Sequence, residues 1–226
     1  MQASNSSDYD KHYFTSRESW PDFRLEMETI LRLARPNPAG RVLELGCGSG
    51  ALLPRLAPHY RLAVGMDISP TGLGLAARSI REKADERSGI ALLCALAESL
   101  PFQGDSFDAV MAQHLVEHLN DPGRALREWY RVLRPGGTLT LITPNGAYPD
   151  GDIFADPTHT TLFTRGSIRS CLEVAGFRVD RINTLFPYLG RGRLARSASI
   201  RLAGVAQRIP GLSLSGRSLV ASATKP

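Results

Sequence analysis

The stretch VLELGCGSGAL, residues 42–52, decides the fold. It closes an apolar run with Gly46, Gly48 and Gly50, and it carries an acid, Glu44, two residues before the first glycine. Glycines at this density let a backbone approach a ligand closely. The loop that cradles nucleotide triphosphates needs a lysine directly after its last glycine. No lysine follows here, which excludes that class of site.

Short apolar runs alternate with helix-like segments along the rest of the chain. Strands are predicted over residues 41–46, 61–67, 90–95, 107–113, 138–144, 177–185 and 217–226. Helices are predicted over residues 17–35, 49–59, 69–84, 121–134 and 165–176. Strands joined by helices form right-handed crossovers, which build a mainly parallel sheet with helices on both faces. The pattern therefore predicts an α/β fold.

Several helix ends carry local signals. Ser69 and Pro70 supply a cap and a first turn, Asp121 caps a later helix, and Thr164 opens the last one. The segment RPGG, residues 134–137, is interpreted as a helix stop and turn before the next strand.

Two ligand classes fit the glycine loop, and a nearby acid separates them. Gly46, Gly48 and Ala51 match a dinucleotide fingerprint, and Asp67 lies where an acid would hydrogen-bond ribose hydroxyls. Glu44, at the carboxyl end of the first strand, would repel a pyrophosphate and attract a cation. S-adenosylmethionine offers both a ribose diol and an α-ammonium beside a sulfonium. The residues therefore favour S-adenosylmethionine over a nicotinamide dinucleotide.

Four segments in order resemble the class I S-adenosylmethionine-dependent methyltransferases. They are VLELGCGSG, VGMDIS, AESLPFQGDSFDAVMAQHLVEHLNDPGRALREWYRVLRPGGTLTLITPN and EVAGF. The first three lie within residues 42–145, and the last extends the likeness to Phe177. The resemblance is closer to the small-molecule branch that includes ubiquinone-biosynthesis O-methyltransferases. It implies a doubly wound, mainly parallel, seven-stranded Rossmann-like α/β sheet with an antiparallel last strand.

The resemblance also suggests a division of the chain. Residues 1–38 are expected to form an N-terminal helical and aromatic extension, and residues 39–226 the methyltransferase domain. Within that domain, residues 145–165 would be an acceptor-side insertion and residues 190–216 a basic segment. The aromatic side chains of the extension would dock it on the sheet or cover a pocket.

Carried over residue by residue, the resemblance implies a cofactor site. The residues assigned to it are Glu44, Gly46, Gly48, Gly50, Met66, Asp67, Ile68, Ala97, Glu98, Gln113 and His114. The first four would form the loop beneath the amino-acid end of S-adenosylmethionine, and Asp67 would hold both ribose hydroxyls. Met66 and Ile68 would flank the adenine, and the pair 97–98 would face it, with helix capping as the alternative role of the glutamate. Residues 113–114 would lie near the methionine end.

Methyl transfer from a sulfonium mainly needs alignment and exclusion of water, and an alcohol or phenol acceptor also benefits from a base. His159, in the segment that follows the fifth strand, is the candidate base or acceptor contact. His118, four residues after His114, is a weaker catalytic candidate. The alternative is that Asp156 and His159 only fix their loop. No metal is expected to bind at His114, Glu117 and His118.

The positive charge gathers at the C-terminal end. From Arg178 onward, eight arginines and one lysine stand against a single acid, so this part carries +8 and the first 177 residues carry −3 of the net +5. Within residues 191–208, Leu194, Ala198 and Leu202 recur at helical spacing. The segment is interpreted as a contact for an anionic membrane, a cover over the acceptor, or a solvated basic face. It lacks interleaved aromatics, so nucleic acid is not expected as a partner.

The cysteines and the hydropathy suggest a compartment. Cys47, Cys94 and Cys171 are scattered without zinc-type spacing, which is typical of reduced thiols in a cytoplasm. The sequence contains no apolar run of about 18 residues and no signal-peptide pattern. The chain is therefore expected in the cytoplasm, with contact to the inner face of a membrane through its basic segment.

The sequence predicts an enzyme that transfers a methyl group from S-adenosylmethionine to a small-molecule, glycan or lipid-linked acceptor, on oxygen. Three alternatives stay open: N- or C-methylation of a small metabolite, S-adenosylmethionine binding without catalysis, and NAD-dependent oxidation. The pattern leaves the oligomeric state open.

Overall fold

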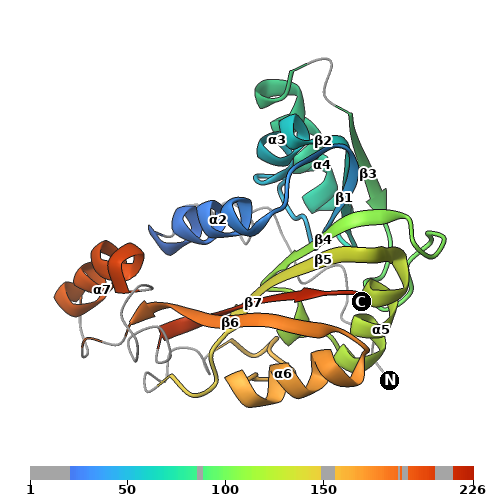
Figure 1. Ribbon diagram of the computed structural model, residues 1–226. Coiled ribbons are helices and arrows are strands. Elements are labelled where there is room, and N and C mark those ends of the chain that lie inside the picture. Colours follow the sequence, from blue (N-terminus) through green and yellow to red (C-terminus); the bar gives the residue numbers. More distant parts are fainter. Residues whose placement is uncertain (1–20, 86–88, 149–155, 188, 190–192, 207–215) are drawn as a thin grey trace.

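A seven-stranded sheet forms the centre of the fold (Figure 1). The computed structural model describes residues 21–85, 89–148, 156–187, 189, 193–206 and 216–226. The strands are β1 (Asn37–Leu45), β2 (Tyr60–Asp67), β3 (Ile90–Cys94), β4 (Phe107–Gln113), β5 (Leu133–Pro144), β6 (Arg178–Pro187) and β7 (Gly216–Thr224), in the order β3-β2-β1-β4-β5-β7-β6. The first five are parallel, and β7 is antiparallel to both β5 and β6. The predicted mainly parallel sheet with an antiparallel last strand is confirmed.

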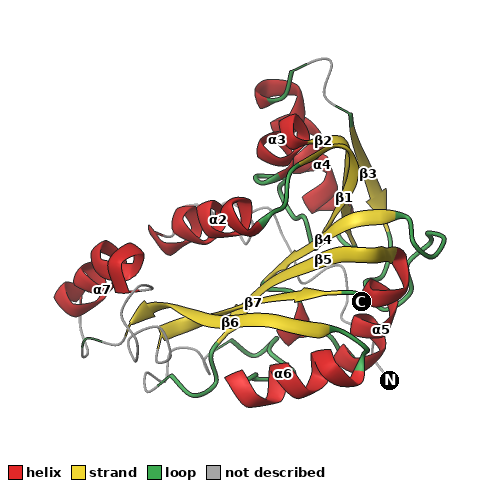
Figure 2. Cartoon of the chain, in the orientation of Figure 1, coloured by secondary structure: helices red, strands yellow, loops and turns green. Residues whose placement is uncertain are grey.

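Helices cover both faces of the sheet (Figure 2). They are α2 (Pro21–Leu33), α3 (Leu53–Leu56), α4 (Pro70–Lys83), α5 (Pro122–Val132), α6 (Arg165–Val174) and α7 (Arg193–Ala206), with short 3-10 turns η2 (Ala57–His59) and η3 (Val116–His118). One hydrophobic core joins α2, α3 and α4 to a sheet face that includes Val42 and Met111. A second core joins α5 and α6 to the opposite face, which includes Leu43 and Leu141. The sheet is therefore doubly wound, as predicted.

The predicted helix caps are present. Ser69 Oγ accepts a hydrogen bond from the Gly72 amide at 3.1 Å, and Asp121 Oδ1 accepts one from the Arg124 amide at 2.8 Å. Thr164 forms a reciprocal capping box at the start of α6. These caps fix where each helix leaves the carboxyl edge of the sheet.

Two predicted element boundaries are corrected. The helix expected over residues 49–59 is only the short α3 followed by the turn η2, because a proline stands at the start of each and interrupts the hydrogen bonding. Residues 134–137 do not stop α5, which already ends at Val132. They lie inside β5, where the pairing with β4 shifts register and Gly136 has a φ of +76°. Such a shift marks a bulge.

Helix α2 lies within the helix predicted over residues 17–35. Its Met27 and Ile30 are buried in the same core as Val42 of β1, so this part of the extension packs on the sheet. The outlying parts of the predicted segments, residues 1–20, 149–155, 190–192 and 207–215, lie outside the described residues. Among the helices that the structure describes, none is both long enough and apolar enough to cross a bilayer.

Candidate active site

The loop after β1 places three glycines in the left-handed region of the backbone map. Gly46, Gly48 and Gly50 have φ values of +66°, +49° and +71°. Residues with a Cβ rarely adopt such angles. A Cβ at Gly50 would also lie 2.8 Å from the Cβ of Ala76 on α4. The loop therefore depends on glycine both for its shape and for its close approach to α4.

Asp67 ends β2 next to this loop and is half-buried. Its Oδ2 accepts a hydrogen bond from the Gly48 amide and its Oδ1 accepts one from the Ser69 amide, both at 2.8 Å. Burial raises the pKa of Asp67, and the backbone hydrogen bonds oppose that rise only in part. A carboxylate oxygen has two acceptor positions. Asp67 can therefore hold the loop and still accept hydrogen bonds from ribose hydroxyls.

Glu44 lies on β1, beside β2, and is only 7 % exposed. Its Oε2 atom is buried and accepts no hydrogen bond from any described residue. Burial and the charge of Asp67 raise the pKa of Glu44 to about 8. A buried carboxyl oxygen without a partner is costly, and a cation bound beside it would remove that cost. The position is suited to a positively charged ligand group.

Of the residues predicted around the adenine, two are buried and two are half-buried. Met66, which is predicted to flank the adenine, is 1 % exposed and belongs to the hydrophobic core. Ile68, just past the end of β2, is half-buried. Ala97 is buried, and its carbonyl accepts a hydrogen bond from Trp129 Nε1 at 3.0 Å. Glu98 beside it is half-buried.

The two residues predicted near the methionine end are held by α2. Gln113 Nε2 donates to Glu26 Oε2 at 2.9 Å, and His114 Nε2 lies 2.9 Å from the same oxygen. Glu26 Oε1 accepts a hydrogen bond from Ser218 Oγ at 2.7 Å. His114 has a φ of +50°, an uncommon value for a residue with a side chain. Glu26 is a member of the site that no motif in the sequence marks.

His114 bridges two buried carboxylates. Its Nδ1 lies 3.1 Å from Oε1 of Glu117, while its Nε2 contacts Glu26. Glu117 Oε2 accepts a hydrogen bond from Thr143 Oγ1 at 3.0 Å. Burial acts to raise the pKa of Glu117, but the hydrogen bond from His114 and the charges of His114 and His118 outweigh it and leave the pKa lowered. A network of side-chain contacts therefore links α2, the end of β4, η3 and β5.

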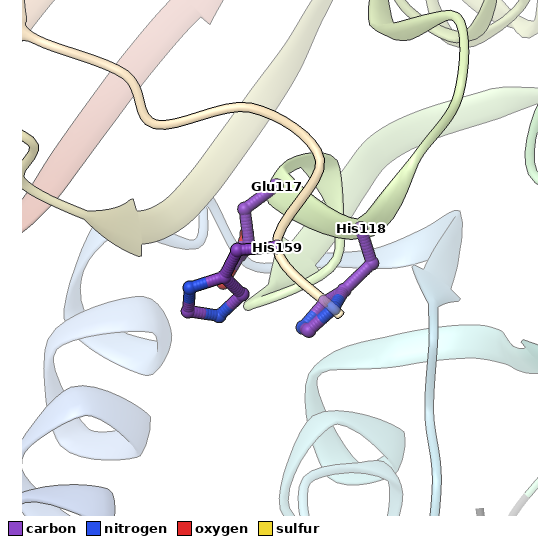
Figure 3. Close-up of side chains that lie close together, drawn as sticks. All are labelled: Glu117, His118 and His159. Atoms are coloured by element: carbon purple, nitrogen blue, oxygen red, sulfur yellow. The ribbon is translucent and has the colours of Figure 1, made fainter. Parts of the chain in front are cut away.

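The two candidate catalytic histidines lie together (Figure 3). The ring centroids of His118 and His159 are 4.9 Å apart. His118 Nδ1 lies 3.0 Å from Thr158 Oγ1, which donates to Asp156 Oδ1 at 2.6 Å. His159 Nε2 lies 3.7 Å from Asp156 Oδ2. Burial is the main cause that lowers the pKa of His118. Asp156 thus shapes the loop and lies beside His159, so both predicted roles of this segment fit the geometry.

Three of these side chains also form a possible donor set for a metal. Ligand atoms of Glu117, His118 and His159 lie within 4.8 Å of one another. Imidazole and carboxylate groups are common ligands of transition metals. However, the carboxylate oxygens of Glu117 already contact His114 and Thr143. A metal would have to share those oxygens with His114 and Thr143, whereas proton transfer by a histidine would not involve them.

The loop that carries His159 has its two ends joined by backbone contacts. Asn145 and Phe163 form an isolated parallel bridge, and the Gly146 amide donates to the Phe163 carbonyl at 2.8 Å. Closer to the histidine, the Thr160 amide donates to the Glu117 carbonyl at 2.8 Å. These contacts fix the described part of the loop against β5 and η3, at the carboxyl edge of the sheet.

Fold and site together define an α/β domain that receives a nucleoside cofactor with a cationic group at the ends of β1 and β2. Residues 43–141 match the family model of a methyltransferase domain. The "Probable S-adenosylmethionine-dependent methyltransferase" of Mycolicibacterium smegmatis is 34 % identical over 172 residues, which are 75 % of this chain and 63 % of that protein. The mitochondrial ubiquinone biosynthesis O-methyltransferase of Rattus norvegicus is 28 % identical over 191 residues, 77 % and 55 % of the two chains. The chain therefore spans less than two thirds of the length of these relatives.

A solved structure shares the fold. It is phosphoethanolamine N-methyltransferase 2 of Haemonchus contortus in complex with S-adenosyl-L-methionine, with a TM-score of 0.72 and 16 % identity, covering 99 % of this chain and 60 % of that one. The family match and the sequence relatives support a class I S-adenosylmethionine-dependent methyltransferase, and the solved structure shows that this chain has the corresponding fold. The NAD-dependent alternative is thereby set aside.

The residues present fit the cofactor of this family. The glycine loop turns through left-handed backbone angles, Asp67 retains acceptor positions for hydroxyls, and Glu44 has a buried oxygen that lacks a partner among the described residues. These three features would hold the amino-acid and ribose parts of S-adenosylmethionine.

Proposed function

We propose that this chain transfers a methyl group from S-adenosylmethionine to an oxygen atom of a small-molecule, glycan or lipid-linked acceptor. The observation that carries the donor assignment is the buried Glu44 carboxyl group, whose Oε2 atom lacks a partner among the described residues and which lies near Asp67 and a loop of three left-handed glycines. When bound, the cofactor supplies an electrophilic methyl group on a sulfonium.

The protein's own residues would bind, orient and move a proton. Glu44 would neutralise the ammonium of the cofactor, and Asp67 would orient its ribose. His159 would take the proton of the acceptor hydroxyl as the oxygen attacks the methyl group, with Asp156 stabilising the imidazolium that forms. His118, whose pKa burial lowers, is the second candidate for that role.

Oxygen is the preferred acceptor atom for two reasons. The rat relative is named for O-methylation. The site also gathers two histidines near a carboxylate, and an alcohol or phenol must lose a proton during the reaction whereas a neutral amine can lose it afterwards. A base held at the carboxyl edge is therefore more useful to O-methylation than to N-methylation.

The test is a transfer assay with S-adenosylmethionine carrying an isotopically labelled methyl group. The protein is incubated with metabolite, glycan and lipid extracts, and labelled products are identified by mass spectrometry and carbon NMR. We expect a labelled methoxy group. A labelled N-methyl or C-methyl group would contradict the oxygen assignment.

Cofactor binding is tested separately from turnover. S-adenosylhomocysteine, the product of the cofactor, should raise the melting temperature of the chain, and NAD should not. Binding of S-adenosylhomocysteine without any labelled product across the extracts would favour a non-catalytic cofactor-binding protein. Failure of S-adenosylhomocysteine to stabilise the chain would overturn the donor assignment itself.

A further inference from the structure

Helix α7 exposes large apolar side chains. Leu194 is 88 % exposed and Leu202 is 48 % exposed, and Leu189, just before the helix, is 40 % exposed. The helix seats on β6 through another face, where Ser199 is buried and Ile200 packs against the core. The leucines therefore do not hold α7 on the sheet.

The exposed side of α7 coincides with the stripe seen in the sequence. Leu194, Ala198 and Leu202 are spaced by four residues, so they project within a narrow arc of the helix. An apolar stripe usually faces a core. Here Leu194 and Leu202 are exposed, so the stripe does not pack the helix on the sheet. An apolar stripe exposed in this way marks a surface that contacts something else.

The charge around this stripe selects the partner. Residues 191–208 contain five arginines and no acidic residue. Arg201 is exposed and lies about two turns beyond Leu194, on the same side of the helix. A basic helix with exposed leucines is the composition that binds the surface of an anionic bilayer, where the leucines enter the headgroup region and arginines contact lipid phosphates.

The position of α7 relates this surface to the site. Strands β5 and β6 are both antiparallel to β7, so β6 runs parallel to β5 and ends at the same edge of the sheet as β1, β2 and β4. Helix α7 follows β6 and lies beyond its end (Figure 1). A bilayer that contacts α7 would thus lie on the side of the molecule where Glu44, Asp67 and the two histidines are placed.

We propose that α7 docks this chain on an anionic lipid surface through Leu194, Leu202 and Arg201. The inference does not depend on the proposed methyl transfer, because vesicle binding is measured without cofactor or acceptor. If both hold, the acceptor would reach the site from the lipid side.

The test is co-sedimentation of the full chain with vesicles of phosphatidylcholine, with and without phosphatidylglycerol. We expect binding only when phosphatidylglycerol is present, and weaker binding as salt is added because screening reduces the contribution of the arginines. The double variant Leu194→Ser/Leu202→Ser should reduce vesicle binding at least tenfold, and Arg201→Glu should reduce it severalfold.

Matched controls separate a loss of docking by α7 from a general effect of changing exposed residues. Val174→Ser removes an 80 % exposed apolar side chain from α6, and Arg78→Glu reverses an exposed charge on α4. Both should bind vesicles like the unmodified chain, and all variants should retain their melting temperature and affinity for S-adenosylhomocysteine. Absence of binding to phosphatidylglycerol vesicles by the unmodified chain would overturn the proposal. So would equal loss in the control variants, or a preference for an acidic protein surface over lipid.

Discussion

The donor half of the site, at the ends of β1 and β2, and the acceptor half, at the ends of β4 and β5, are held together in different ways. In the donor half, Asp67 contacts backbone amides, and Glu44, the glycine loop and Asp67 come from one short stretch of the chain. In the acceptor half, the His114 side chain contacts both Glu117, three residues later, and Glu26, 88 residues earlier in the sequence. The donor half therefore depends on backbone shape, and the acceptor half depends on a polar side-chain network.

The largest expected effect lies in the acceptor half. Glu117→Ala removes a fully buried carboxylate from between His114 and Thr143 and should lower the free energy of unfolding by about 3–5 kcal/mol, as for a broken buried ion pair. Urea denaturation measures this change. Glu82→Ala, at an exposed position of α4, is the control and should have little effect. A loss equal to that of the control would show that the network does not stabilise the fold.

The donor half is tested by Asp67→Ala. Loss of charge-assisted hydrogen bonds to the ribose should weaken the binding of S-adenosylhomocysteine by about 1–3 kcal/mol. Isothermal titration calorimetry measures the affinity. Unchanged affinity would contradict the assignment of Asp67 to the ribose. An equal loss of affinity in Glu82→Ala would show that the effect is not specific to Asp67.

His159 in the acceptor half should control turnover without controlling cofactor affinity. Once an acceptor is identified, His159→Ala should lower turnover about tenfold or more, because a general base is lost. Affinity for S-adenosylhomocysteine should stay the same. His59→Ala replaces an exposed histidine after α3 and is the control. Full activity of His159→Ala would place the base elsewhere, with His118 as the next position to test.

The donor half also predicts a pH dependence of stability, which comes from Glu44. Its pKa is about 8 in the folded chain against an ordinary value of 4.5, so between these values the folded state holds a proton that the unfolded state has lost. Stability without ligand should therefore fall as pH rises through this window, by at most about 1.4 kcal/mol per pH unit. Urea denaturation at several pH values measures the slope.

The variant Glu44→Gln and the bound ligand each test whether Glu44 causes this pH dependence of stability. The variant cannot ionise, so its slope should be flatter, and saturating S-adenosylhomocysteine should flatten the slope of the unmodified chain because the ammonium stabilises the carboxylate. An identical slope in the variant and in the unmodified chain would show that Glu44 does not titrate in this range.

The donor half was predictable because its signals are local. Gly46, Gly48 and Gly50 are needed for left-handed angles within a few residues, and Asp67 ends a strand that the apolar pattern already marks. Met66 is the exception. Its place just before that acid suggested a ligand contact, but the alternation of side chains along β2 sends it into the core with Val64.

The acceptor half was only partly predictable because its contacts join distant segments. His118 and His159 were found by residue type and by their places after strands. Glu26 was not found, since an acid within an amphipathic helix is ordinarily taken to face water. It is buried because Gln113, His114 and Ser218 supply its partners, and those contacts exist only once α2 packs on the sheet.

The closed base of the acceptor loop has a consequence for altering specificity. Asn145, Gly146 and Phe163 join the two ends of the loop outside the donor half. The Thr160 amide donates to the Glu117 carbonyl, a backbone hydrogen bond that any residue at 160 other than proline can make. Residues 147–155 can therefore be exchanged between related chains while Asp156, Thr158 and His159 are retained. Such chimaeras would sample different acceptors while keeping one methyl-donor site.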